Sequence, residues 1–382
     1  MIWLFLWRKV MENTLISMLI NHAIALAEAV DYQAVKPNPR VGALILNKTG
    51  KTVGMGAHQQ WGGPHAEVLA IQEALQTGAD LSNCTLYVTL EPCSHTGKTP
   101  PCTDLIIREG IPRVVYASKD PNPKVNGAEI LNANGVEVIY SPTEKALELN
   151  KEFFVNQLFN RPYCILKMAQ TANGYISEAE GVQTSISNSF SKAHLHQQLR
   201  SNCDAILSTA KTVITDNATL NIRTGNNHRE LTAIVIDHDL ALLGRPDLAI
   251  RYKRNNSRLM LVTDSRYSGP QRVEGIDIIT IPFLNRKADL KVLLHQLYSE
   301  FSVHRLLVES GPLLANNLLL QDCVDEYHLY TASHLISPKN GIRGIESSLL
   351  QKATKNRQLD LQGDRYEVFT LRHLGKIFPN LV

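Results

Sequence analysis

Four residues between positions 65 and 102 have side chains that bind or serve a metal ion. His65, Cys93 and Cys102 offer one imidazole nitrogen and two thiolates, which are donors that Zn²⁺ prefers. A catalytic zinc site takes three protein ligands and leaves its fourth position to water. Glu67 follows His65 by two positions, where its carboxylate could move protons beside such a metal. The set therefore predicts a hydrolytic zinc site.

The order of these residues narrows the chemistry. A His-x-Glu pair followed by a Pro-Cys pair and a second cysteine is the pattern of zinc deaminases, in which the glutamate serves as general acid and base. The segment "HAE" alone would be weak evidence for a zinc site. Here it is followed by "EPC" and by a second prolyl-cysteine, and these strengthen the evidence. A structural zinc is the alternative, with His95 as its fourth ligand, but that interpretation leaves Glu67 without a role. The sequence favours catalysis, with Glu67 moving protons between water, the ring nitrogen and the leaving ammonia.

The elements that must position these residues alternate between strands and helices. A proline precedes His65 and another precedes Cys102, and each of the two residues stands where a predicted helix begins. At Cys102 the positive end of the helix dipole would favour the thiolate form. Short connections between alternating elements predict a layered α/β domain. The pattern predicts strands at 41–48, 84–90 and 113–118, and helices at 65–78, 102–110 and 143–160.

The pattern restarts at "RPYCILKMA", which predicts a second α/β domain. A chain of 382 residues exceeds what one hydrophobic core usually supports. We expect a non-essential extension at 1–10 with Met11 as a candidate start, a first domain at 11–156 and a second at 157–382. Strands are predicted in the second half at 161–169, 204–209, 231–237, 258–263, 276–281 and 305–310.

Composition excludes several classes of partner. A net charge of +3 with scattered basic residues indicates no nucleic-acid partner. The apolar run before Arg8 is too short for a signal peptide or a membrane span, so no membrane association is expected. Six cysteines without a regular framework indicate a reducing compartment, and we expect a cytoplasmic protein. Four of them are predicted to be buried small apolar residues: Cys84, Cys164, Cys203 and Cys323.

Four blocks of the first half, "KPNPRVGALI", "GAHQQWGGPHAEVLAI", "YVTLEPCSHTGKTPPCTDLII" and "DPNPKVNGAEIL", resemble the deaminase half of the bifunctional deaminase/reductases of riboflavin biosynthesis. The long insert "SHTGKTPP" between Cys93 and Cys102 distinguishes that family from deaminases with a Cys-x-x-Cys spacing. The resemblance implies a cytidine-deaminase-like, three-layer domain. It also implies a small-molecule substrate, 2,5-diamino-6-(5-phosphoribosylamino)pyrimidin-4-one, whose 2-amino group is hydrolysed. Asn38 and His58 would line its pocket.

The second half contains "RLLVESGPLLANNLLLQ", a strand ending at Glu309, a turn and a helix whose N-terminus could bind a phosphate. With "PYCILKMAQTANG", "LRSNCDAILSTAKTVITDNATLNIR" and "VDEYHLY" it resembles the reductase half of the same family, which has a dihydrofolate-reductase-like fold and reduces a ribosyl group with NADPH. The resemblance implies cofactor contacts from Ala169, Thr212, Asp216, Gly311, Pro312, Leu313, Leu314, Ala315, Asn316 and Asn317. It implies substrate contacts from Lys167, Arg200, Leu220, Arg223 and Glu309, the cations holding the 5′-phosphate.

The reductase half departs from the family pattern at three places. In the first, Asn173 stands where the family has a carboxylate and Tyr175 where it has a basic residue. In the second, the segment "VQTSIS" at 182–187 lacks the tryptophan that the family has there. In the third, the segment "DNA" at 216–218 keeps Asp216 but lacks the acidic residue that follows it in the family. One alternative is therefore an active deaminase whose second domain is an inactive oligomerisation scaffold. Another is a nucleic-acid base deaminase with a binding module, which the low aromatic content disfavours. The stretch "LLANNLLL" suits a homo-oligomer, and we expect a dimer or tetramer.

Overall fold

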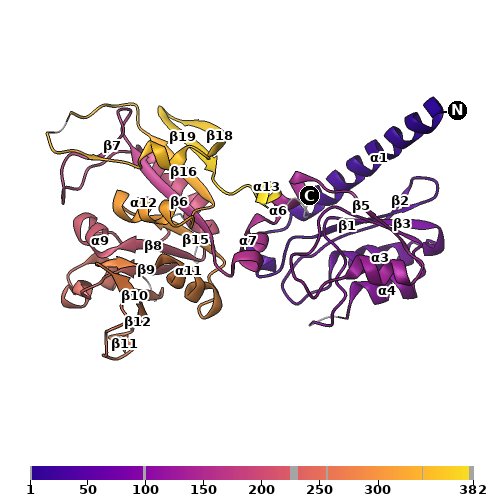
Figure 1. Cartoon of the computed structure of the whole chain (residues 1–382), viewed down its shortest axis with the longest axis horizontal. Helices are drawn as coiled ribbons and strands as arrows, with labels where there is room; N and C mark the ends of the chain where they lie inside the picture. The colour runs from indigo at the N-terminus through magenta and orange to yellow at the C-terminus, as the bar shows by residue number, and fades with distance from the viewer. Residues whose placement is uncertain (1, 98–99, 224–230, 255–256, 338, 378–382) are drawn as a thin grey trace. The chain divides into compact units, whose positions relative to one another are not determined.

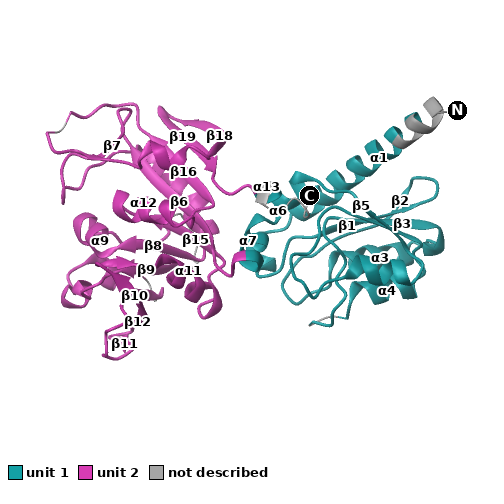
Figure 2. Ribbon diagram, in the orientation of Figure 1, with its two compact units in different colours: residues 1–158, 374–382 teal, residues 159–373 magenta. Residues whose placement is uncertain are grey.

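The computed structural model divides into two compact units, shown in two colours in Figure 2. Unit 1 comprises residues 1–158 and 374–382, and unit 2 comprises residues 159–373. Residues 2–97, 100–223, 231–254, 257–337 and 339–377 are described by the structure. The segment predicted to be an extension, 1–10, is continuous with a single helix, α1 (Ile2–Glu28), apart from residue 1, which lies outside the described residues.

Unit 1 has three layers, with one sheet between two layers of helices (Figure 1). The sheet order is β2 (Thr52–Ala57), β1 (Gly42–Asn47), β3 (Cys84–Val88), β4 (Arg113–Tyr116) and β5 (Glu137–Tyr140). β1 is antiparallel to β2 and β3, whereas β3, β4 and β5 are parallel. The helices are α1, α2 (Tyr32–Val35), α3 (Ala66–Gln76), α4 (Cys102–Arg108), α5 (Gly127–Ala133), α6 (Glu144–Leu149), α7 (Lys151–Phe159) and α13 (Leu374–Ile377).

Alternate residues of β1 face the two helical layers. Leu44 and Leu46 belong to the same core cluster as the buried side of α1, which is formed by Ile16, Ile20, Ala23, Ile24 and Ala27. The stretch Val10–Glu28 is long and apolar enough to cross a membrane by length and composition, and this buried side packs in unit 1. The other face of the sheet approaches α3 closely. A Cβ at Gly54 would lie 2.1 Å from the Ala70 carbonyl oxygen, so glycine is needed there.

Unit 2 is built on a ten-stranded sheet. Its order is β11 (Arg272–Val273), β12 (Ile276–Ile281), β10 (Leu259–Asp264), β9 (Thr232–Ile236), β8 (Ala205–Thr209), β15 (Arg305–Glu309), β6 (Tyr163–Gln170), β16 (Glu326–Thr331), β19 (Asp364–Thr370) and β18 (Thr354–Leu361). The strands from β12 to β16 are parallel, and β11, β19 and β18 add antiparallel edges. The remaining strands are β7 (Tyr175–Ser177), β13 (Phe283–Leu284), β14 (Lys287–Ala288) and β17 (Ile342–Arg343).

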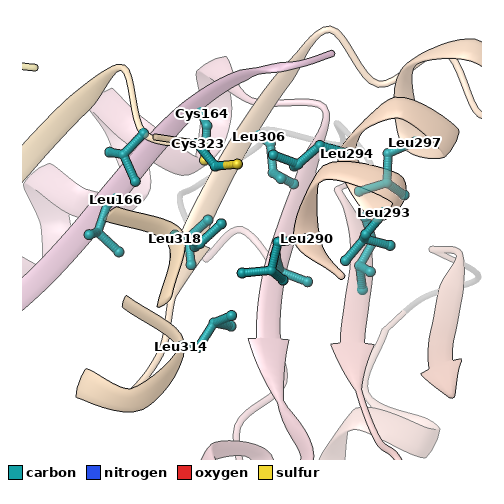
Figure 3. Packing of buried hydrophobic residues seen from close by; sticks show 14 of the residues in the cluster. Cys164, Leu166, Leu290, Leu293, Leu294, Leu297, Leu306, Leu314, Leu318 and Cys323 are labelled. Carbon is teal, nitrogen blue, oxygen red and sulfur yellow. The ribbon is translucent and has the colours of Figure 1, made fainter. Parts of the chain in front are cut away.

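Two leucine-rich helices cover one part of this sheet. Figure 3 shows leucines of α11 (Leu290–Ser299) and of α12 (Pro312–Leu320) packed with Cys164, Leu166 and Leu306 from the strands. Because residues of α12 and β15 belong to this one core cluster, α12 packs against β15, and the position of the N-terminus of α12 is fixed. The other helices of unit 2 are α8 (Ser189–His194), α9 (Ala210–Asp216) and α10 (Ala249–Tyr252).

One buried carboxylate ties together the chain that enters unit 2 and the chain that leaves it. Asp325 accepts two hydrogen bonds from the Arg161 guanidinium, both at 2.7 Å, and one from Arg372 Nε at 2.8 Å. It also accepts the Cys164 N–H at 2.8 Å. The Arg372 guanidinium lies 4.4 Å from the centre of the Phe159 ring. The first and last residues of unit 2 are thus held at one place.

The α/β class predicted for both halves is confirmed, and each predicted strand overlaps an observed one. The helix predicted at 143–160 is wrong in one respect, because it breaks into α6 and α7 at Asn150. Asn150 has φ −123° and ψ 25°, which is outside the helical range. Its side chain accepts the Arg40 N–H at 2.8 Å and donates to the Arg40 carbonyl at 2.9 Å. The sequence analysis missed β2 and β5 in unit 1, β16, β18 and β19 in unit 2, and the short strands β7, β11, β13, β14 and β17.

We predict that Gly54→Ala destabilises unit 1. The added methyl group overlaps the Ala70 carbonyl and forces α3 away from β2, at a cost of about 1–3 kcal/mol. Thermal unfolding should show a transition lowered by several degrees, and zinc content should fall because His65 directly precedes α3. Gly244→Ala is the control, because a Cβ there meets no atom within 4 Å. An unchanged transition in Gly54→Ala would contradict the packing described.

Candidate active sites

The three predicted zinc ligands lie where helices begin or a strand ends. His65 is the residue that precedes α3, and Cys102 is the first residue of α4, after Pro101. Cys93 lies in the loop that follows β3, and its carbonyl accepts the Thr103 N–H at 3.2 Å. Three separate segments therefore converge on one point of unit 1.

The geometry of the three ligand atoms fits zinc. His65 Nδ1 lies 3.5 Å from Cys93 Sγ and 3.3 Å from Cys102 Sγ, and all three atoms lie within 4.8 Å of one another. Tetrahedral zinc with Zn–N and Zn–S bonds of about 2.0 and 2.3 Å requires N···S separations of about 3.5 Å. No group of metal ligands other than these three is found among the described residues. His95, the fourth ligand of the structural alternative, is not part of the group.

The local charges favour a thiolate. The Cys102 thiol and the Cys102 backbone N–H, whose nitrogen is 3.3 Å from Cys93 Sγ, donate toward the Cys93 sulfur. These donors and His65 hold the pKa of Cys93 well below its usual range, although burial opposes them. Because the thiolate is the form that binds metal, the site is prepared for a cation.

Glu67 lies in the first turn of α3 and is buried, with 4% of its surface exposed. Burial raises the pKa of Glu67 to about 7, and the nearby Cys93 charge adds to the effect. A general acid and base works best when its pKa is close to the working pH. A carboxyl group with such a pKa can both take and give a proton near neutral pH.

Asn38 and His58, implied to bind the substrate, lie together beside the metal site. The Asn38 amide Nδ2 lies 3.1 Å from His58 Nε2, and His58 Nδ1 lies 2.9 Å from the Pro64 carbonyl. The carbonyl can only accept, so Nδ1 carries the proton and Nε2 accepts from Asn38. Burial lowers the pKa of His58, so its ring is neutral. The hydrogen bonds therefore hold the Asn38 and His58 side chains in place at one side of the cavity.

A cavity of about 290 Å³ joins these groups. It is lined by Asn38, His58, His65, Glu67 and Cys93, together with residues that the sequence analysis did not single out: Trp61, Glu91, Asp120, Asn122 and Phe153. Asp120 and Asn122 follow β4, and burial raises the pKa of Asp120 to about 6. Both residues belong to the block "DPNPKV", whose resemblance to the family could have indicated that they line the pocket. Of the insert "SHTGKTPP", residues 98 and 99 lie outside the described residues.

In unit 2, two of the predicted substrate residues are direct neighbours in the sheet. Glu309 on β15 pairs in register with Lys167 on β6. Arg200 holds the Glu309 carboxylate with two parallel hydrogen bonds, Nε to Oε1 at 2.7 Å and Nη2 to Oε2 at 3.0 Å. Burial would raise the pKa of Glu309, but Arg200 and Lys167 lower it to about 2. The carboxylate therefore stays ionised.

Leu220 and Arg223, the remaining two predicted substrate residues, lie in the segment that borders Arg200 and Glu309. Arg200 Nη1 donates to the Asn221 carbonyl at 2.7 Å, which links it to the segment that holds Leu220 and Arg223. Leu220 is buried and has a positive φ of 49°, and its carbonyl accepts a hydrogen bond from Arg254. The Arg223 residue as a whole is exposed, but partial burial of its guanidinium group, and then the charge on Arg200, lower the pKa of Arg223. The structure thus brings all five predicted substrate residues to one region.

The predicted cofactor residues surround the neighbouring strand ends. Because β8 and β15 are parallel neighbours, α9 with Thr212 and α12 with Gly311 begin at the same edge of the sheet. A Cβ at Gly311 would meet no atom within 4 Å, so the N-terminus of α12 faces open space that suits a phosphate. Ala169 lies on β6, whereas Asp216 lies at the far end of α9.

The side chains along α12 divide into two groups. Leu314 and Ala315 are buried in the core of unit 2, so their contacts with a cofactor would come from the backbone. Leu313 is 83% exposed. Asn316 Oδ1 is buried without a hydrogen-bond partner within the described part of the chain. Pro312 and Asn317 complete the predicted stretch on the same helix.

The family departures have local structural explanations. Asn173 Nδ2 donates to the Ile336 carbonyl at 2.6 Å, while its Oδ1 accepts from Thr171 at 2.8 Å. A carboxylate could not donate the first of these bonds. The Tyr175 ring lies under the Arg343 guanidinium at 4.6 Å. Gln183, in the segment that lacks tryptophan, reaches the Asp216 carbonyl at 3.4 Å.

Two family models match the chain. The model described as "Cytidine and deoxycytidylate deaminase zinc-binding region" matches residues 17–118. The model described as "RibD C-terminal domain" matches residues 162–365. The first match includes the three metal ligands and Glu67, and the second includes the Lys167, Arg200 and Glu309 cluster.

Curated and solved relatives match nearly the whole chain. The riboflavin biosynthesis protein RibD of Aquifex aeolicus is 35% identical over 347 residues, which are 88% of this chain and 93% of that protein. RibD of Bacillus amyloliquefaciens is 36% identical, covering 83% and 84%. A solved deaminase/reductase structure from Thermotoga maritima has a TM-score of 0.76 and 29% identity, covering 94% of this chain and 99% of that one.

We predict that Cys102→Ser loses zinc while Cys84→Ser keeps it. The serine hydroxyl is a poor ligand for zinc, and only Cys102 belongs to the ligand group. Cys84 is a buried strand residue whose Sγ lies 3.3 Å from the Asp80 carbonyl. Elemental analysis of the purified proteins should give about one zinc per chain for wild type and Cys84→Ser. Equal zinc in Cys102→Ser would argue against the assigned set.

Proposed function

Because this chain belongs to the RibD family of bifunctional deaminase/reductases of riboflavin biosynthesis, we propose which of its residues carry each reaction. In unit 1, His65, Cys93 and Cys102 hold zinc and Glu67 is the proton-transfer group. In unit 2, Lys167, Arg200 and Glu309 form the centre of the substrate site. The convergence of three metal ligands beside one buried glutamate supports the first assignment most directly.

The deaminase reaction replaces the 2-amino group of the pyrimidinone with a carbonyl oxygen from water and releases ammonia. Zinc in such a site supplies Lewis acidity that lowers the pKa of water to about 7. Glu67 takes one proton from the attacking water and delivers it to the ring nitrogen. It then takes the proton of the hydroxyl group added at C2 and delivers it to the amino group, which leaves as ammonia while the carbonyl forms. Its burial and its pKa of about 7 suit both directions of transfer. Asn38 and His58 orient the pyrimidine ring.

The reductase reaction converts the ribosyl group of 5-amino-6-(5-phosphoribosylamino)uracil to ribityl. NADPH supplies the hydride that reaches C1′. The N-terminus of α12 at Gly311 and the first turn of α9 at Thr212 hold the cofactor. Arg200 is fixed by Glu309, and Arg223 lies nearby, so the two guanidinium groups are placed to bind the 5′-phosphate. Asn173 supports a loop rather than the reaction itself.

We predict that Glu67→Gln separates the two activities. The amide keeps the size of the side chain but cannot transfer protons, so ammonia release should fall by roughly 10²–10⁴-fold. Zinc content should be unchanged, because Glu67 is not a ligand. The change in absorbance at 340 nm should show that supplied deaminated intermediate is still reduced at the wild-type rate.

The same assay gives the opposing outcome. If a folded, zinc-loaded Glu67→Gln protein lost both activities, this result would contradict the assignment of two independent sites. Release of ammonia by the wild type without oxidation of NADPH, even with supplied intermediate, would instead favour the scaffold alternative for unit 2. Binding of NADPH, followed by protein fluorescence, shows separately whether the cofactor site is intact.

The chain is also proposed to be a cytoplasmic homo-oligomer, a dimer or tetramer. A reducing compartment suits a site that depends on two thiolates. Two exposed leucines support the oligomer: Leu313 is 83% exposed and Leu320 is 70% exposed. They lie two turns apart on α12, and therefore on one side of that helix.

We predict that Leu320→Glu weakens self-association. A charge on the apolar side of α12 opposes burial in an interface without touching the residues assigned to either reaction. Light scattering coupled to size exclusion should give a smaller mass for Leu320→Glu than for wild type. Lys352→Glu, which changes charge at an exposed position outside α12, is the control. A wild-type mass for Leu320→Glu would remove α12 from the interface.

A further inference from the structure

His196 is a buried residue of unit 2 that neither assigned reaction uses. It is 7% exposed and lies in the short segment Leu195–Leu199, between α8 and Arg200. Four charged residues from different parts of the fold act on its ring: Arg200, Arg223, Glu309 and Lys167. All four belong to the proposed substrate site, and the ring is hydrogen-bonded to the backbone of one of them, Arg223, so the histidine borders that site.

The proton of the imidazole ring has a defined position. The Arg223 backbone N–H donates to His196 Nδ1 at 3.0 Å. Since Nδ1 accepts, the proton of the neutral ring is on Nε2. Nε2 has no hydrogen-bond partner among the residues described, and it is not one of the fully enclosed polar atoms. The ring therefore presents one accessible N–H donor within the cluster of charges.

The charges around this donor favour an anion. Glu309 is engaged by Arg200 through two hydrogen bonds, so its negative charge is already matched. Lys167 and Arg223 make no salt bridge with the described part of the chain, and burial lowers the pKa of each, so a bound anion would stabilise their charged forms. The cations thus exceed the carboxylates here, and a phosphate monoester, which carries close to two negative charges at neutral pH, would restore the balance.

We propose that His196 is a substrate-binding residue of the reductase site, where its Nε2–H donates a hydrogen bond to the phosphate group of the substrate. This inference rests on the proposed function of unit 2 and adds a residue to it. Arg200 and Arg223 supply charge to the phosphate, whereas His196 supplies a donor whose direction is fixed through Nδ1 by the backbone of Arg223.

Proton uptake follows from the same arrangement. Burial, and then the charges of Arg200 and Arg223, lower the pKa of His196 to about 4, so the ring is neutral in the empty site at pH 7. A bound dianion reverses the local potential and raises that pKa. Because the complex then binds more protons than the free protein, affinity for the dianion falls as pH rises through the pKa of the complex.

A pair of substitutions separates binding from support of the fold. In His196→Asn the side-chain oxygen takes the place of Nδ1 and still accepts the Arg223 N–H, but the distal donor is lost. In His196→Gln the amide nitrogen lies near the position of Nε2 and keeps that donor. With saturating NADPH and supplied deaminated intermediate, His196→Asn should raise KM roughly 10-fold, while His196→Gln should recover part of the loss.

The other unit provides the control for folding. Ammonia release by unit 1 and the thermal unfolding of the protein should be the same in both variants and wild type. A wild-type KM in His196→Asn would overturn the proposal. So would an equal rise of KM in both variants together with a lower unfolding temperature, because that result assigns His196 to support of the fold.

A second readout does not require turnover. Sulfate serves as the probe, because it is a dianion that exchanges no proton near neutral pH. Calorimetric titration in buffers of different ionisation enthalpy should show proton uptake on sulfate binding by wild type and none by His196→Asn. Equal uptake by both would overturn the inference. A wild type that takes up protons with sulfate but never oxidises NADPH would count against the proposed reductase activity and not against the anion contact.

Discussion

In both units the groups proposed to carry the chemistry are positioned by strands that run in the same direction. β3 and β4 are parallel, so the loops that follow them bring Cys93 and Asp120 to one edge of the sheet of unit 1. β6, β15 and β8 are parallel in unit 2, so Lys167 and Glu309 lie side by side where α9 and α12 begin. Helix N-termini meet the same edges, and a thiolate or a phosphate is stabilised there.

Burial has opposite consequences for the two glutamates at these edges. Glu67 is buried beside a thiolate, and its pKa rises to about 7, so the group can both take and give a proton. Glu309 is also buried, but Arg200 and Lys167 hold its pKa at about 2, so it remains a fixed charge that orients Arg200. The neighbouring charges, and not burial alone, thus separate a group that transfers protons from one that holds its partner in place.

Much of this was predictable from the sequence, because short-range patterns carry it. The spacing of His65, Glu67, Cys93 and Cys102 predicted the metal site, and the apolar runs predicted the central strands. What the sequence does not display is pairing over long distances. β16, β18 and β19 become recognisable only when their antiparallel register is formed. The Asn150 side chain is bonded to the backbone of Arg40, which lies far away along the chain, and the tautomer of His196 depends on the backbone of Arg223.

The bonds of Asp325 have a topological meaning. Unit 1 takes residues from both ends of the chain, so unit 2 is an insertion within it, and the polypeptide crosses between the units twice. Arg161 lies just after the chain enters unit 2 and Arg372 just before it leaves, and both are bonded to Asp325. Within unit 2 the two ends of the inserted segment are therefore closed on one carboxylate. If the chain were cleaved before Phe159 or after His373, the end left on unit 2 would still be bonded to Asp325.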